Sequence, residues 1–203
     1  METAKDDIHH IRRIMERSST FLSLSGLSGI SAGASALLAS GLAWQLMYKH
    51  QINYLDGITN SYSSQLIIQL IGLACLTFIV AILTGYYFTR NKAKKLNLSL
   101  WTNTSKAMLI HLLIPLITGA CLCLILISYN LFVMVAPTTL LFYGLSLVSA
   151  SKFSHREIFT LGSIEIVLSL IGFLFPGYGL LIWALGFGVF HILYGIIMHI
   201  KYQ

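Results

Sequence analysis

The first long apolar stretch of the chain reads FLSLSGLSGISAGASALLASGLAWQLMY and covers residues 21–48. Ser, Gly or Ala stands at about every second position, a composition that weakens a helix in water. In lipid the backbone has no alternative hydrogen-bond partner, so the helix is secure, and small residues let a neighbouring helix approach closely. The stretch therefore predicts a transmembrane helix with a close-packing face.

The small residues of this stretch recur every four positions and form two adjacent ladders. Residues four apart lie on the same face of a helix. We therefore predict a broad flat face that packs this span into the centre of a helix bundle or against another copy of the chain. The first ladder is Ser25, Gly29 and Gly33, and the second is Ser28, Ala32, Ala36 and Ser40.

The composition of the whole chain agrees with a lipid environment. Of 203 residues, 56% are hydrophobic and only 10% are charged, whereas a soluble domain carries about 25% charged residues. The net charge of +6 does not indicate nucleic-acid binding, because the basic residues gather at the ends of apolar runs, where head groups and topology signals act. The sequence predicts an integral membrane protein with the lipid bilayer as its partner and no nucleic acid.

Six apolar stretches are long enough to cross a membrane, which requires about 20 residues. The predicted fold is an all-α bundle of six transmembrane helices in a single domain, residues 21–203. The spans cover residues 21–48, 65–88, 107–127, 131–151, 158–175 and 178–199.

The basic residues predict the orientation of these spans. All of the 13 lysine and arginine residues except Lys49 fall in the N-terminal segment, in the second and fourth connections, or in the C-terminal tail. Positively charged connections stay in the cytoplasm, so both termini are predicted to be cytoplasmic. Residues 1–20 are predicted to be a cytoplasmic amphipathic segment, with a short helix over residues 5–17, because Ile8, Ile11 and Met15 recur at helical spacing. This helix is expected to lie on the inner leaflet, and docking of a partner is the alternative. We interpret the first span as a retained anchor, although Ala34-Ser35-Ala36 resembles a signal-peptide cleavage site.

Glu165 is the only acidic residue within a predicted span. A charged residue at this depth is costly, so Glu165 is expected to face the bundle and to be protonated or paired. His191 lies at a similar depth on the other side of the turn at Pro176-Gly177. We hypothesise that Glu165 and His191 share a proton. The alternative is that each hydrogen-bonds a nearby backbone carbonyl or serine and only stabilises packing.

Other residues give weaker signals. Pro115 and Pro137 lie within predicted spans, where a proline removes a hydrogen bond and is expected to kink the helix. His111 and His199 lie near span ends without the spacing of metal ligands. The sequence shows no catalytic constellation, and we predict no metal and no cofactor.

Four stretches of the chain resemble an uncharacterised family of small multi-spanning membrane proteins of Bacteroidetes-type bacteria. They are IRRIMERSSTFLSLSGLSGISAGASAL and WALGFGVFHILYGIIMHIKY near the two ends, and the shorter TRNKAKK and IPLITGA between them. The resemblance implies a location in the bacterial inner membrane. It implies no activity and no substrate.

Two classes of function fit the sequence. The first is a structural or regulatory membrane component that assembles with itself or with another membrane protein. It is favoured because a single buried acidic residue is few groups for a proton or ion pathway. The second is a small proton- or ion-coupled transporter or channel that uses Glu165 and His191. The environment of Glu165 discriminates between them: a polar, water-accessible cavity would favour transport, and a dry contact with small residues would disfavour it.

Overall fold

The computed structural model describes residues 25–53 and 62–202. Every element of regular secondary structure in this part of the chain is a helix. The predicted N-terminal amphipathic segment, residues 1–20 with its short helix, lies outside the described residues. Six helical segments are long and apolar enough to cross a membrane, as the sequence predicted. They cover Gly26–Lys49, Ser64–Lys95, Asn103–Ser128, Phe132–Phe153, Arg156–Leu174 and Pro176–Tyr202.

The first three of these segments are the continuous α-helices α2 (Gly26–Lys49), α3 (Ser64–Lys95) and α4 (Asn103–Ser128). Helix α3 is longer than predicted, because the basic sequence that follows residue 88 continues the helix. Side-chain caps begin two of them: Ser63 accepts a hydrogen bond at the start of α3, and Thr102 forms a capping box with Ser105 at the start of α4.

The last three segments are less regular. The fourth consists of the 3-10 turn η2 (Phe132–Met134), α5 (Val135–Ala150) and η3 (Ser151–Phe153), and the fifth is α6 (Arg156–Leu174). The sixth begins with η4 (Pro176–Tyr178) and α7 (Gly179–Trp183), continues as the π-helix η5 (Ala184–Phe190), and ends as α8 (His191–Tyr202). A π-helical segment within a longer helix is rare and is frequently found at functional sites.

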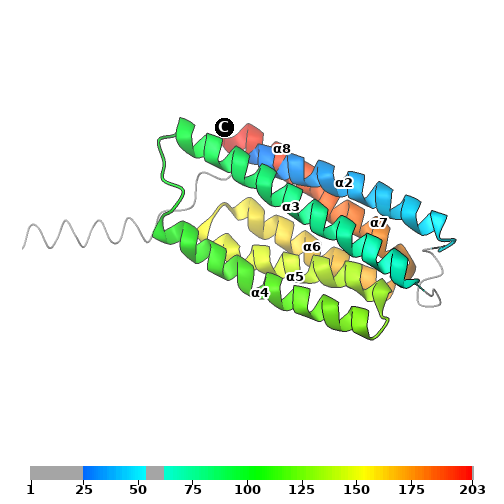
Figure 1. Ribbon diagram of the computed structural model, residues 1–203. Coiled ribbons are helices and arrows are strands. Elements are labelled where there is room, and N and C mark those ends of the chain that lie inside the picture. Colours follow the sequence, from blue (N-terminus) through cyan, green and yellow to red (C-terminus); the bar gives the residue numbers. More distant parts are fainter. Residues whose placement is uncertain (1–24, 54–61, 203) are drawn as a thin grey trace, which may run out of the picture.

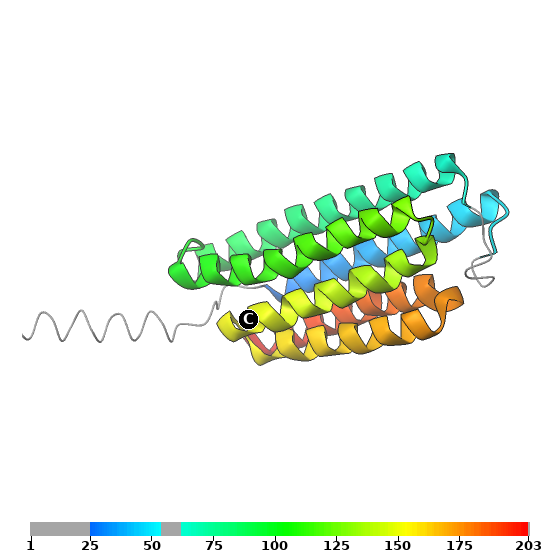
Figure 2. The same cartoon turned by 90° about the horizontal axis from the view of Figure 1, so that it is seen from below.

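The helices form a bundle in which the first described helix packs against the last segment as well as against its neighbour in sequence. Helix α2 packs between α3 and the η5–α8 segment, and α5 packs between α4 and α6. Figure 2 shows α3 and α4 along one side of the bundle, and α6 and α8 along the other. Among the described elements, only α2 packs against α3 over an extended length.

The start of α2 and the end of α8 lie at the same end of the bundle (Figure 1). The contact of Gly26 with Gly195 and His199 places them side by side. The basic ends of α3 and α8 therefore share one end of the molecule, and Lys49, at the end of α2, lies at the other. This is the distribution of charge from which the sequence predicted cytoplasmic termini, and the orientation in a membrane stays a prediction.

The glycines of the α2 face lie against the last segment. A Cβ atom at Gly29 would lie 3.0 Å from the Cα of Gly195, and one at Gly33 would lie 2.6 Å from the carbonyl oxygen of Gly188. The ladder formed by Ser25, Gly29 and Gly33 is buried inside the molecule, and the second ladder is buried at Ala36 and Ser40 and half-buried at Ser28 and Ala32. The structure thus places this face within the bundle.

Serine hydroxyls in α2 are satisfied within their own helix. Ser40 Oγ donates to the carbonyl oxygen of Ala36 at 2.8 Å, and Ser31 and Ser35 donate to carbonyls three residues earlier. Back-bonding of this kind removes the cost of placing a hydroxyl in an apolar environment. The serines therefore act as small residues in the contact.

The two prolines occupy different places in their helices. Pro115 lies inside α4, where its missing N–H leaves a carbonyl without its usual partner. Pro137 is the third residue of α5, and the 3-10 turn η2 directly precedes this helix. The kinks expected at Pro115 and Pro137 both stay predictions.

Candidate functional site

Glu165 lies on the buried face of α6 and is 0% exposed. The buried residues of this helix recur at three- and four-residue steps, so Glu165 shares its face with Leu161, Gly162 and Ser169. Its Oε2 atom lies directly against Gly186 of η5, where a side chain would collide with both the carboxylate and Leu140. The carboxylate of Glu165 thus lies buried beside a glycine and a leucine.

His191 lies beside this carboxylate, as the counting of residues around the turn suggested. It is the first residue of α8, it is buried, and its Nδ1 atom lies 3.3 Å from Glu165 Oε1. The same Nδ1 atom lies 3.1 Å from the carbonyl oxygen of Gly186. Both oxygens of Glu165 nevertheless lack a hydrogen-bond partner of acceptable geometry. We conclude that the N–H of His191 points at the carbonyl, and that the contact with Glu165 is close but poorly aligned.

Tyr143 of α5 completes the group, and the sequence analysis missed it. Its hydroxyl lies 2.8 Å from His191 Nε2. Phe187 packs on both rings, with centroids 4.9 Å from Tyr143 and 5.7 Å from His191. A tyrosine in the middle of a span is the signal that was available in the sequence, but nothing in the chain order pairs residue 143 with residue 191.

Gly186 contacts both of these side chains from within the π-helix η5. It lies five residues before His191, and its carbonyl oxygen lies 3.1 Å from the imidazole Nδ1 atom. The same residue lacks a side chain, which leaves room for the Glu165 carboxylate. Gly186 therefore accepts the hydrogen bond of His191 and also leaves space for Glu165.

A second polar group lies at the end of the bundle that is predicted to be cytoplasmic. Glu157 at the start of α6 pairs with Lys201 at 2.5 Å and accepts hydrogen bonds from the hydroxyl of Tyr202. The ring of His155 stacks on Tyr202 with centroids 4.0 Å apart. Burial lowers the pKa of His155, with Lys92 and Lys201 acting in the same direction and Glu157 against them. This group joins the ends of α6 and α8 and shows no arrangement of catalytic type.

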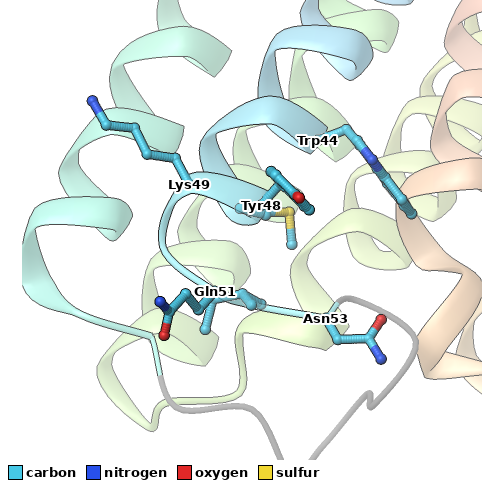
Figure 3. A pocket seen from close by; sticks show the side chains of 7 residues that line it. Trp44, Tyr48, Lys49, Gln51 and Asn53 are labelled. Carbon is cyan, nitrogen blue, oxygen red and sulfur yellow. The ribbon is translucent and has the colours of Figure 1, made fainter.

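A recess lies at the opposite end, where α2 ends (Figure 3). Lys49 is its only charged lining residue, and in Figure 3 it extends away from Trp44 and Tyr48. The recess borders residues outside the described part of the chain, and its lining includes no set of groups that suggests a reaction. It is lined by Trp44, Met47, Tyr48, Lys49, Gln51, Ile52 and Asn53.

The described residues include no group of three His, Cys, Asp or Glu side chains that could hold a metal ion. His111 lies 3.3 Å from the hydroxyl of Ser149, and His199 lies near Gly26. The two histidines therefore lie on different helices with different neighbours. Cys75 and Cys121 are exposed, whereas Cys123 is buried.

Comparison of the chain with protein-family models, with curated proteins and with solved structures finds no match. The resemblance noted from the sequence is therefore not tested by these comparisons.

Proposed function

We propose that this protein is a structural or regulatory component of the bacterial inner membrane that acts by assembling with a second copy or with another membrane protein. The enclosure of Glu165 carries this proposal. The side chain is fully buried and packed against Gly186 and Leu140, which is the small-residue contact that disfavours a transport pathway. Helix α6, which carries Glu165, also meets α5 through glycines, since Gly144 of α5 and Gly162 of α6 each approach the other's carbonyl oxygen.

Assembly requires a face that the bundle itself does not use. The glycines of α2 pack against η5 and α8, so this face is not available to another chain. Helix α3 offers a second face, because only α2 packs against it extensively among the described elements. Residues at three- and four-residue steps form one stripe on its outer side. We call this stripe the α3 outer face; it comprises Ile68, Gly72, Cys75, Ile79, Leu83 and Tyr86, all exposed.

Gly72 and Cys75 make the α3 outer face testable in the natural chain. A Cβ atom at Gly72 would meet nothing within 4 Å, so this glycine is not needed for packing within the bundle. Small residues on a lipid-facing surface allow close approach of another helix. We therefore propose that α3 of one copy packs against α3 of a second copy around Gly72.

We expect a short membrane-permeant thiol crosslinker to join two copies through Cys75 in intact membranes. The Cys75→Ser variant should lose this product. The Cys121→Ser variant should keep it, because Cys121, although also exposed, lies on α4 and not on the α3 outer face. Gly72→Leu should reduce the product about tenfold or more, as expected when a side chain opposes a helix contact worth roughly 1–2 kcal/mol.

Gly41→Leu is the matched control for Gly72→Leu, because Gly41 is also exposed and its added Cβ meets nothing. It should leave the crosslinked product unchanged. A Cys75 adduct with a different protein would support assembly with another partner. Absence of any Cys75 product, or equal loss in both leucine variants, would contradict the proposed α3 contact.

The transporter alternative is favoured by one observation, namely that both carboxylate oxygens of Glu165 lack a hydrogen-bond partner in the described structure. Buried ionisable groups within spans commonly mark proton pathways. If the protein moves protons, proteoliposomes with an acidic exterior should acidify inside, and Glu165→Gln should abolish the effect. A rate equal to that of empty vesicles would count against this alternative.

A further inference from the structure

Glu165, His191 and Tyr143 come from three different helices and meet in the interior of the bundle. The carbonyl oxygen of Gly186 can only accept a hydrogen bond, so the Nδ1 atom of His191 that contacts it must carry a hydrogen. His191 Nε2 faces the hydroxyl of Tyr143. A neutral imidazole satisfies both contacts, with Nδ1 donating to the carbonyl and Tyr143 donating to Nε2.

With His191 neutral, the carboxylate of Glu165 has nothing to balance a negative charge. Neither of its oxygens receives a well-aligned hydrogen bond. A bare carboxylate in such a place is far less stable than a neutral acid. The titratable side chains that the described structure places beside Glu165 are Tyr143 of α5 and His191 of α8. Helix α7 and the π-helix η5 contain no charged residue.

We infer that Glu165 is a buried proton-binding site that holds one proton in the folded protein, and that Tyr143 and the Gly186 carbonyl keep the neighbouring His191 neutral. Glu165 is the group that binds the proton, and Tyr143 is a positioning residue that acts through His191. This site is independent of the proposed α3 contact, so each can fail without the other.

Infrared spectroscopy of the purified full-length protein in lipid tests the inference. A protonated carboxylic acid gives a carbonyl stretch that a carboxylate lacks. At about pH 8, well above the range in which exposed carboxyls titrate, we expect this band in the wild type. It should shift when the glutamate residues are labelled with ¹³C. It should vanish in Glu165→Gln and persist in Glu157→Gln, since Glu157 lies at the end of α6 and pairs with Lys201.

Tyr143→Phe tests the positioning role. Without the tyrosine hydroxyl, His191 Nε2 is free to take a proton, and a positive imidazole favours ionised Glu165. We expect the acid band of Tyr143→Phe at about pH 8 to be weaker than that of the wild type. A hydroxyl that only fills space would leave the band unchanged.

Two results would overturn the inference. One is the absence of the acid band from the spectrum of the labelled wild type at about pH 8. This result would rule out a protonated Glu165 even if the Glu165→Gln variant does not fold. The other is an acid band that survives in folded Glu165→Gln. An unchanged acid band in Tyr143→Phe would overturn the positioning role alone.

Discussion

Replacing Gly33 with leucine is expected to separate α2 from the last transmembrane segment and to destabilise the bundle by more than about 3 kcal/mol, beyond the usual cost of overpacking. The first side-chain atom alone would lie 2.6 Å from the carbonyl oxygen of Gly188 and 2.9 Å from the backbone nitrogen of Ile192. Backbone atoms cannot move aside as a flexible side chain can. The loss of stability is measured by thermal unfolding in detergent, monitored through the reactivity of the buried Cys123.

Two substitutions in the same helix serve as controls for Gly33→Leu. Gly41→Leu adds the same side chain at a position where the new atom meets nothing, and Leu38→Ile changes a residue that is 72% exposed. Both should unfold within about 0.5 kcal/mol of the wild type, as surface changes usually do. Equal destabilisation by Gly33→Leu and Gly41→Leu would show that the α2 contact with Gly188 does not hold the bundle together.

Replacing His191 with leucine is expected to lower the stability by about 3 kcal/mol, because it removes the partner of two polar groups at once. The Tyr143 hydroxyl loses its hydrogen bond, and Glu165 loses the imidazole that lies 3.3 Å from its Oε1 atom. Unfolding titrations in mixed micelles give the change in free energy. His111→Leu is the matched control, and it should cost less than about 1 kcal/mol because His111 is exposed.

The double variant Glu165→Met, His191→Leu separates a coupled pair from two independent residues. If the residues interact, the double variant loses less stability than the sum of the single variants, by about 1 kcal/mol or more. Replacing both residues by apolar ones of similar size also removes the carboxyl group that His191→Leu leaves without its imidazole neighbour. Fully additive losses in folded variants would contradict an interaction between Glu165 and His191.

The helices could be predicted from the sequence because each is a local property of its apolar run. The predicted spans and the helices of the structure agree in number and nearly in position, and the largest difference is the extension of α3 to Lys95. The apolar run ends at residue 88, but the helical hydrogen bonds continue through the lysines. A basic segment at a membrane surface is still a good helix former, so the end of the hydrophobic run does not mark the end of the helix.

The candidate site could be predicted only in part. Glu165 is distinctive because it is an acid within a span, and His191 follows from its depth relative to the turn at Pro176-Gly177. Tyr143 and Gly186 could not be predicted, because their roles depend on the rotation of α5 about its axis and on a π-helical segment within the last span. Neither property has a periodic signature in the sequence.

The sequence by itself determined that the chain folds into six apolar helices, because in lipid every backbone group must be satisfied within its own segment. It also determined that the small residues of α2 favour close packing. Only the tertiary structure decided which glycines are used, since Gly33 lies against Gly188 whereas Gly41 and Gly72 meet nothing within 4 Å. All three look alike in the sequence. What distinguishes them is the backbone that faces each one, and that is fixed by the arrangement of the helices.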